Sequence, residues 1–387
     1  MAVLVTGYPN FMAQRLVRRE LDARAGGRAG AAAAGTEGKV YVLVQEKHAA
    51  RAAAQLRSHP AGARGEIVTG DVCILDLGLS GREVRALTAE LTRIHHAAEV
   101  SYLGLAGSAT REVNVGGTRM VLDLAEECTR LRRLVHYSTV FVSGARHGVI
   151  LESELDEGQR FRNHWEGSKF EAELLVRRAM GRVPASVVRP GIVVGDSRSG
   201  EIGRLDGPYY LMALMVLAPT EAPVPLPGRG ATPLNVVPID FVERAAMIIA
   251  GDERGVGRTF HVTDPNPVSA RRVFELVARS AGRAPPTGGL PIALSRLLMR
   301  VPIVERFVRS PRQFVDYFDH LALYSCRNTL ELLDGTGVAC PPFESYVDVL
   351  IGYVKDYLAT RRRQRAATAA EPDEGREGGR KEGEVSS

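Results

Sequence analysis

Apolar runs of strand length alternate with amphipathic stretches of helix length through the first half of this chain. The alternation is typical of a parallel sheet covered by helices on both faces, because parallel strands need crossover connections that helices usually supply. It argues against an all-helical or an all-strand fold and predicts an α/β, doubly wound arrangement. The predicted strands are residues 2–6, 40–45, 66–71, 93–98, 133–140 and 185–194. The predicted helices are residues 11–23, 84–91, 116–128 and 166–180.

The composition disfavours several classes of protein. The net charge is +5, but the arginines are scattered along the predicted helices, which favours solvated helix faces over nucleic-acid binding. The four cysteines show neither zinc-site spacing nor a disulfide framework, so we expect buried thiols, no metal and a reducing cytoplasm. The first apolar run, MAVLVTG, is too short for a signal peptide, and no segment reaches the roughly 18 apolar residues that span a bilayer.

A Thr-Gly turn stands between the first predicted strand and the first predicted helix, in VLVTGYPNFMAQRLV (residues 3–17). At such a turn the exposed N–H groups and the positive end of the helix can bind the pyrophosphate of a dinucleotide. Thr6, Gly7, Asn10 and Phe11 are therefore candidate cofactor-binding residues. A simple strand-to-helix turn is the alternative.

The end of the second strand bears on the type of dinucleotide. A carboxylate there normally binds the adenosine ribose diol, whereas a basic residue accepts a 2′-phosphate. This chain has Lys47 in VQEKH (residues 44–48) and Arg15 on the first helix, and both favour NADP. Glu46 lies beside Lys47 and leaves NAD open.

The pattern of the sequence changes after residue 196, where a Pro-rich stretch and short helical patterns replace the alternation of strands and helices. We predict a dinucleotide-binding Rossmann domain over residues 1–196 and a smaller, mainly helical substrate lobe over 197–360, with 236–263 returning to the sheet. The Gly/Ala-rich segment 23–38 predicts a lengthened surface loop or a frayed helix end. Residues 361–387 contain almost no apolar residue besides alanine, so they predict a disordered tail.

Seven segments occur in an order and spacing that resembles the extended short-chain dehydrogenase/reductases. More narrowly, they resemble the branch of male-sterility-type fatty acyl reductases and thioester-reductase domains, and the resemblance covers about residues 2–360. It implies NADPH-dependent reduction of an acyl thioester or a related carbonyl. The segments are GDV (70–72), HHAAEV (95–100), NVGGTRMVLDLA (114–125), HYSTVFVSG (136–144), NHWEGSKFEAE (163–173), VVRPGIVVGDSRSGE (187–201) and LNVVPIDFVERAA (234–246).

The first turn departs from the family's T-G-x-x-G-x-x-G pattern. Only Gly7 is kept, while Asn10 and Ala13 hold the second and third glycine positions. Alanine is accepted at the third position, where the helix packs closely on the strand. Asn10 is the more serious departure, because the second glycine lets the backbone approach the phosphate. Asparagine is nevertheless the residue that best tolerates a left-handed backbone after glycine, and its side chain is small and polar.

The resemblance also implies roles for residues that match the family's motifs. Packing roles are the alternative for each of them. The implied cofactor contacts are Asp71 and Val72 at the adenine, Ala97 and Ala98 at the pyrophosphate and nearer ribose, Lys169 at the nicotinamide ribose, and Pro190 and Gly191 under the nicotinamide. Asn114 would support the helix that carries the active site, and Thr139 would hydrogen-bond the substrate carbonyl.

The catalytic helix departs from the family at its proton donor. Trp165 stands four residues before Lys169, where the family has a tyrosine whose phenol protonates the substrate oxygen while the lysine lowers its pKa. An indole N–H can donate a hydrogen bond but cannot act as a general acid. Three hypotheses follow: a substitute donor, either His164 or Tyr137; a site that has lost reduction and kept dinucleotide binding, as a sensor, scaffold or partner subunit; or a site for another ligand, with Trp165 in the nicotinamide space.

Two apolar segments of the predicted lobe, residues 207–217 and 289–310, are rich in Met and Leu. They predict either a surface over a long acyl chain or carrier-linked thioester, or the ordinary core of the lobe. Residues 289–310 are also basic and amphipathic, which would allow weak contact with a membrane surface, although Pro291 and Pro302 interrupt them. The expected partner is a small-molecule or carrier-linked acyl substrate, and the oligomeric state stays open.

Overall fold

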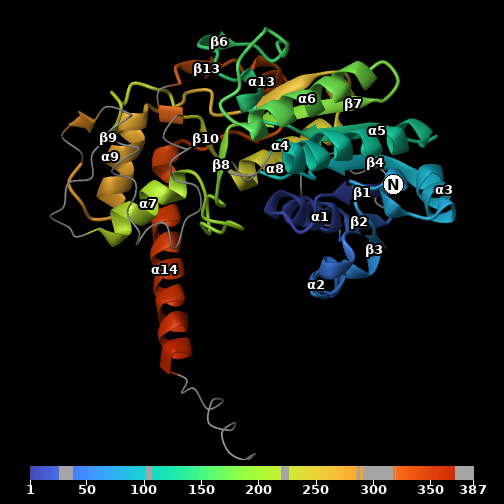
Figure 1. Cartoon of the computed structure of the whole chain (residues 1–387), viewed down its shortest axis with the longest axis horizontal. Coiled ribbons are helices and arrows are strands. Elements are labelled where there is room, and N and C mark those ends of the chain that lie inside the picture. Colours follow the sequence, from blue (N-terminus) through green and yellow to red (C-terminus); the bar gives the residue numbers. More distant parts are fainter. Residues whose placement is uncertain are drawn as a thin grey trace, which may run out of the picture.

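A seven-stranded parallel sheet forms the centre of the protein (Figure 1). The computed structural model describes residues 1–25, 38–101, 107–218, 226–285, 288–290, 317–318 and 320–370. The sheet has the order β11-β7-β5-β4-β1-β2-β3, so the direction of winding reverses between β1 and β4. Its strands are β1 (Ala2–Thr6), β2 (Val40–Val44), β3 (Gly65–Thr69), β4 (Leu91–His96), β5 (Arg133–Tyr137), β7 (Ala185–Pro190) and β11 (Thr259–Val262). This is the doubly wound α/β fold predicted from the sequence, and its ligand crevice is expected at the carboxyl ends of β1 and β4.

Helices cover both faces of this sheet. Val3 and Val5 of β1 point into one hydrophobic cluster, while Ala2 and Leu4 point into the other. Strands buried on both faces need apolar residues at consecutive positions, which explains the continuous runs in the sequence. The first face is covered by α1 (Phe11–Arg24), α2 (Glu46–Arg57) and α8 (Ile239–Gly251). The second face is covered by α3 (Gly81–Glu90), α5 (Gly117–Glu127) and α6 (His164–Ala179).

A third hydrophobic cluster belongs to the C-terminal lobe, which lies to one side of the sheet in Figure 1. The predicted acyl-chain segment 207–217 is almost entirely α7, whose side chains from Pro208 to Ala213 are buried and so form the core of this lobe. Of the predicted membrane-contact segment 289–310, only residues 289 and 290 are described. The elements of the lobe are α7 (Pro208–Leu217), α9 (Ala270–Ser280), α14 (Val347–Ala370), β9 (Leu226–Pro227) and β12 (Gly289–Leu290).

The C-terminal helix is longer than the sequence predicts. The helix α14 packs against α7 and α9 and continues to Ala370, past the residue 361 at which we predicted disorder to begin. The residues 361–370 are poor in large apolar side chains, but alanine, arginine and glutamine have high helix propensity. Residues 371–387 lie outside the described part of the chain.

Several predicted boundaries also differ. The strand predicted over 133–140 ends at Tyr137, because Thr139 begins a 3₁₀ helix (Val140–Ser143) by accepting a hydrogen bond from the Phe141 N–H. The strand predicted over 185–194 is divided at Gly191 into β7 and β8 (Ile192–Val194). The strand β8 pairs with β10 (Val236–Pro238) in a separate two-stranded sheet. Of the predicted loop 23–38, residues 26–37 are not described.

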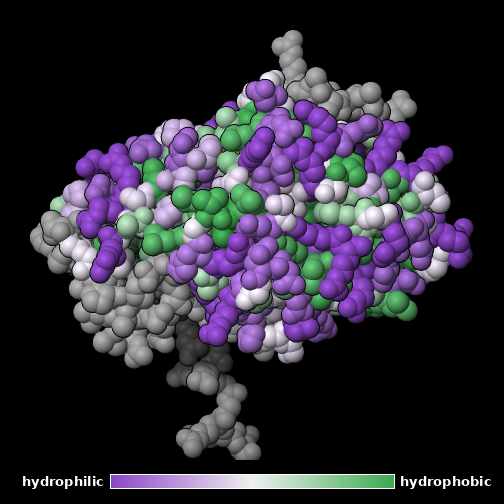
Figure 2. Space-filling view, turned by 90° about the horizontal axis from the view of Figure 1, so that it is seen from above, coloured by the Kyte–Doolittle hydropathy of each residue, from purple (hydrophilic) through white to green (hydrophobic). Residues whose placement is uncertain are grey.

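A small apolar surface lies on the face of the molecule that carries β6 (Gly148–Ile150) and β13 (Ala322–Tyr324). These strands pair in parallel, and the cross-strand pair Val149 and Leu323 is exposed. Figure 2 shows apolar side chains gathered near the middle of this face. The chain continues from β13 into α13 (Arg327–Leu333). In the described residues, none of the helices has the length and apolar character needed to cross a membrane.

Candidate cofactor and active site

The turn after β1 touches the backbone that follows β4. Gly7 has a φ of +97°, and a Cβ atom on it would lie 2.5 Å from the Ala97 carbonyl carbon and 2.6 Å from the Ala98 nitrogen. Only glycine accepts both the left-handed backbone and this close approach. Ala97 and Ala98 are themselves buried, so the predicted pyrophosphate residues from β1 and β4 form one packed unit.

Asn10 holds the same unit together from the start of α1. Its side-chain oxygen accepts a hydrogen bond from the Ala13 N–H at 2.7 Å, and its side-chain amide donates to the Ala97 carbonyl at 2.6 Å. Its φ is −64°, an ordinary N-cap conformation, so the tolerance of asparagine for a left-handed backbone is not used at this position. Asparagine is selected here because it caps the helix and bridges to the chain after β4.

The first turn of α1 fits a pyrophosphate. Phe11 and Met12 are its first helical residues, and the N–H groups of a first turn have no intrahelical acceptor. These donors lie at the positive end of the helix dipole, which favours an anion. Thr6 does not add a hydroxyl to this loop, because its Oγ1 is buried in a 2.9 Å hydrogen bond with Nδ1 of His96.

Replacing Gly7 with alanine should destabilise the protein more than the same change at Gly257. Gly257 also has a positive φ (+71°), but nothing lies within 4 Å of a Cβ built there. Gly257→Ala therefore reports the cost of the left-handed backbone alone, and Gly7→Ala adds overpacking against Ala97 worth about 1–3 kcal/mol. Urea unfolding of both variants measures the difference. Equal losses would contradict the close approach.

Asp71, which the resemblance implies lies at the adenine, follows β3. Its carboxylate accepts hydrogen bonds from the Cys73 N–H at 2.9 Å and from Gln45 at 2.6 Å. Partial burial opposes ionisation, but these hydrogen bonds and the charge of Lys47 outweigh it and lower the pKa of Asp71. Val72 is buried against α5, where a Cβ on Gly117 would lie 2.9 Å from it. Lys47 is exposed at the start of α2, where a 2′-phosphate could reach it.

The contacts of Arg15 contradict our prediction that this residue binds a 2′-phosphate. Its guanidinium lies 2.6 Å from a carboxylate oxygen of Glu243 and 2.6 Å from one of Asp196. These contacts tie α1 to α8 and to the loop after β8. Arg15 is therefore engaged in a structural ion-pair network, and of the two basic residues only Lys47 supports NADP.

The loop after β4 is connected to the active-site helix by Asn114. This residue lies in a π-helical turn (Glu112–Gly116) between α4 (Gly107–Arg111) and α5. Its side-chain oxygen accepts from the Val100 N–H at 2.8 Å, and its amide donates to Ser168 Oγ at 2.9 Å. π-Turns are frequent at functional sites. This geometry would allow the supporting role that the resemblance implies for Asn114, which stays a prediction.

Lys169 is buried beneath the carboxyl end of β5, with 2% of its side chain exposed. Its ammonium donates to the Tyr137 carbonyl at 2.5 Å and lies 3.0 Å from a carboxylate oxygen of Glu99. Thr139 follows β5 and is also buried, and its Oγ1 accepts from the Phe141 N–H at 3.3 Å. The Thr139 hydroxyl proton therefore stays available for a ligand.

Pro190 and Gly191 lie beside these residues at the end of β7. The Ser138 N–H donates to the Val188 carbonyl, which places Thr139 next to the last residues of β7. A Cβ on Gly191 would lie 2.4 Å from the Asn235 carbonyl oxygen, so glycine is needed where the chain passes from β7 to β8. The predicted substrate and nicotinamide residues thus share one edge of the sheet.

Trp165 lies one helical turn before Lys169 on α6, and residues at this spacing share a helix face. Its ring centroid is 6.2 Å from that of Phe141, two residues beyond Thr139. The indole nitrogen is buried and has no hydrogen-bond partner among the residues that the structure describes. An unsatisfied buried donor costs roughly 1–3 kcal/mol, so this N–H is a donor that a ligand oxygen could satisfy.

Neither hypothetical substitute acid is placed to replace the phenol. His164 is the exposed first residue of α6, and its ring lies against Gly107. The Tyr137 side chain belongs to the hydrophobic cluster on the α1 face, and its hydroxyl is hydrogen-bonded to His95 Nδ1 at 2.9 Å. Burial, with the charge of Glu20, raises the pKa of Tyr137 well above its usual range. Its phenol is therefore directed away from Lys169 on α6.

Two acidic residues of this region were missed from the sequence. Glu99 pairs with Lys169, as described above. Glu173, fully buried on α6, accepts from Ser138 Oγ at 2.6 Å and pairs with buried Arg189 at 2.6 Å. A charged residue in an apolar strand such as VVRPG needs a partner, and that signal could have pointed to Arg189.

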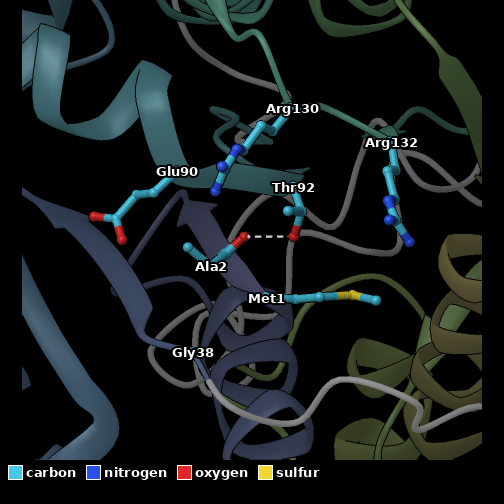
Figure 3. Close-up of a pocket in the computed structure, with 7 residues that line it drawn as sticks. All are labelled: Met1, Ala2, Gly38, Glu90, Thr92, Arg130 and Arg132. Atoms are coloured by element: carbon cyan, nitrogen blue, oxygen red, sulfur yellow. Dashed lines mark hydrogen bonds between the residues drawn. The ribbon is translucent and has the colours of Figure 1, made fainter.

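The described residues also line a cavity of about 500 Å³, but it lies at the opposite edge of the sheet (Figure 3). Ala2 and Leu91, the first residues of β1 and β4, mark this edge, and Thr92 Oγ1 donates to the Ala2 carbonyl at 3.0 Å. It is separate from the crevice at the carboxyl ends of these strands. Its lining residues are Met1, Ala2, Gly38, Glu90, Thr92, Arg130 and Arg132.

A doubly wound sheet with a dinucleotide turn after β1 and a lysine-bearing α6 beside β5 defines an NAD(P)-binding fold of the short-chain reductase type. The sequence matches the male sterility protein family over residues 31–246, more than half of the chain. The chain belongs to this family, the branch that the sequence motifs resemble, and NAD(P) is its cofactor class.

Curated relatives and solved structures are consistent with this assignment. The chain is 31% identical to the glycine betaine reductase ATRR of Emericella nidulans over 217 residues, which cover 55% of this chain and 17% of that protein. It is 24% identical to the fatty acyl-CoA reductase wat of Drosophila melanogaster over 286 residues, which cover 62% of this chain and 55% of that protein. The match therefore spans less than two thirds of either relative.

Two solved structures illustrate the shared fold. The terminal R domain from the myxalamid PKS-NRPS pathway superposes with a TM-score of 0.72 at 24% identity, covering 92% of this chain and 90% of that one. The UDP-glucuronic acid 4-epimerase of Bacillus cereus, solved in complex with NAD, gives a TM-score of 0.64 at 14% identity, covering 92% and 99%. At these identities the likeness shows the fold alone.

Proposed function

We propose that this protein binds NADP(H) and an acyl thioester in the manner of the thioester reductases, and that its reductase chemistry is impaired because Trp165 has replaced the proton donor. One observation carries the proposal. Lys169 and Thr139 are both buried at the carboxyl end of β5, and the indole N–H of Trp165, one turn from Lys169, has no hydrogen-bond partner in the described part of the chain. The donor position is filled by a group that donates a hydrogen bond but no proton.

The residues of the site would still perform part of the reaction. Bound NADPH would supply a hydride for the carbonyl carbon of the substrate. The Thr139 hydroxyl and the Trp165 N–H would donate hydrogen bonds to the carbonyl oxygen, which stabilises developing negative charge. The final proton would have to come from solvent. Losing a positioned general acid typically costs about 10²–10⁴ in rate, so we expect slow reduction rather than none.

The choice of cofactor and substrate rests on separate observations. Lys47, exposed beside Asp71, supports NADP over NAD. The names of the similar proteins support an acyl substrate: fatty acyl-CoA reductases occur among the curated relatives, and a thiolation-reductase di-domain occurs among the similar structures. A coenzyme A ester or a carrier-linked thioester is therefore the proposed substrate class.

A second candidate function is a dinucleotide-binding sensor, scaffold or partner subunit. The observation that favours it is the coincidence of two departures from the family. The second loop glycine is replaced by Asn10 and the donor tyrosine by Trp165. Asn10 nevertheless caps α1 and hydrogen-bonds the Ala97 carbonyl, so the loss of the second glycine leaves the turn ordered. The loss of the tyrosine at Trp165 removes the general acid.

Cofactor titration and turnover test the proposal together. Trp165 is the only tryptophan, so its fluorescence reports directly on the site. We expect NADPH to quench it with saturation and more tightly than NADH, while acyl-CoA or acyl-pantetheine thioesters are reduced slowly. Absence of any quench together with absence of calorimetric binding would favour a different ligand. Rapid reduction that survives replacement of both His164 and Tyr137 would contradict the impaired chemistry.

A further inference from the structure

The segment Ala97–Val100 after β4 is fixed by contacts with two other parts of the chain. Gly7 and Asn10, at the start of α1, hold Ala97. Asn114, in the π-turn, accepts from the Val100 N–H at 2.8 Å and donates to the Val100 carbonyl at 3.2 Å. Glu99 is therefore presented from a backbone that is held on both sides.

The carboxylate of Glu99 faces the site and contacts Lys169. One oxygen lies 3.0 Å from the Lys169 ammonium, and 31% of the Glu99 side chain is exposed while only 2% of Lys169 is. The ammonium of Lys169 has three donors, of which one is used for the Tyr137 carbonyl, and it also forms the ion pair with Glu99. A carboxylate has about four acceptor positions, so Glu99 keeps several after this contact.

We propose that Glu99 is a ribose ligand that acts with Lys169 on the nicotinamide side of the cofactor. The inference rests on the proposed binding of NADP(H). A ribose diol has two hydroxyl donors and several acceptor lone pairs, and the pair offers it carboxylate acceptors from Glu99 and an N–H donor from Lys169. Carboxylates bind ribose hydroxyls in the same way at the end of the second strand of dinucleotide-binding folds.

The paired charges of Lys169 and Glu99 are better matched to a neutral ribose than either charge would be alone. An unpaired ammonium buried to the extent of Lys169 would be costly, and Glu99 compensates it. The hydroxyls of a ribose are neutral, so a neutralised pair can bind them by hydrogen bonds without adding repulsion near the pyrophosphate. A purely structural ion pair would compensate Lys169 as well, but it would not distinguish the two halves of the cofactor.

Glu99→Gln tests this distinction with two ligands. NADPH carries the nicotinamide ribose, whereas adenosine 2′,5′-bisphosphate carries only the adenine half. We expect calorimetry to show that the variant binds NADPH about tenfold or more weakly, because a hydrogen bond to a charged group is lost, while the bisphosphate binds within twofold of the wild type. Glu126→Gln is the matched control, since it removes an exposed ion pair with Arg182 at 2.8 Å and should change neither affinity.

The remaining outcomes separate this inference from the proposed function. Unchanged or tighter NADPH binding by Glu99→Gln would overturn the ribose contact. Equal losses for both ligands would also overturn it, because they indicate a general disturbance of the site. If the wild-type protein binds neither ligand, the proposed function fails together with the inference. Thermal unfolding of Glu99→Gln checks that the variant is folded at the temperature of the titration.

Discussion

Replacing Trp165 with tyrosine should increase the rate of NADPH-dependent thioester reduction by about 10²–10⁴-fold. The substitution places a phenol on the face of α6 that carries Lys169, one turn away. The Lys169 ammonium would lower the pKa of that phenol, and the hydroxyl could then deliver a proton to the substrate oxygen. Tyrosine is smaller than tryptophan, so it fits the space beside Phe141 without overpacking.

Trp165→Phe is the control for this experiment. It removes the indole N–H and supplies no acid, so it should be as slow as the wild type or slower. The initial rate of NADPH oxidation with a saturating acyl thioester is compared among the wild type and the two variants. Because the variants have no tryptophan, the fluorescence of NADPH itself is used to follow its binding. Similar rates for the tyrosine and phenylalanine variants would show that the missing phenol does not limit the reaction.

Lowering the pH from about 6.5 toward 4 should destabilise the folded protein steeply. Burial, as the first cause, lowers the pKa of all the buried histidines described here, to about 3 for His96 and about 4 for His320. Their folded pKa values lie below the unfolded value of 6.5, so the unfolded state binds more protons below that pH and stability falls with it. Each of these histidines therefore lowers the free energy of unfolding by about 1.4 kcal/mol for every pH unit below 6.5, until its folded pKa is reached. The buried histidines are His95, His96, His136, His261 and His320.

His136 gives the most specific test of this expectation. Both its ring nitrogens are buried and find no hydrogen-bond partner within the described ranges, and burial first, then the charges of Lys169 and His96, lower its pKa. His136→Leu removes the titrating group without losing a hydrogen bond, so the slope of unfolding free energy against pH should fall by about 1.4 kcal/mol per unit. Urea unfolding from pH 8 to 4 measures it. A slope in His136→Leu equal to that of the wild-type protein would contradict the prediction.

The fold was predictable because the hydrophobic pattern and the topology agree. Each of the six predicted strands overlaps a strand of the main sheet, and the seventh, β11, lies in the segment 236–263 that we predicted to return to the sheet. The helix α2 was missed because EKHAARAAAQLR buries only Ala52 and Leu56. An alanine-rich helix with so narrow an apolar face leaves little periodicity to detect.

Residues of the candidate site could be predicted from the sequence where their role depends on local geometry. They were harder to predict where the role depends on partners that are distant in the sequence. Gly7 and Asn114 follow from a turn and a helix contact that short motifs encode. Arg15 was misassigned because its partners, Asp196 and Glu243, are far away in the sequence. Glu99 was missed because only the folded chain brings it to Lys169.

From the contacts of the four-residue connection Ala97–Val100 we expect nucleotide binding and chemical turnover to be separable properties of this protein. The contacts that order the turn after β1 involve Asn10 and Asn114, and Trp165 contributes no side-chain hydrogen bond to them. We therefore expect that one substitution on α6 slows the reaction while the nucleotide-binding turn stays ordered. A protein that keeps its nucleotide-binding turn when catalysis is impaired can acquire a regulatory role in evolution without a change of fold.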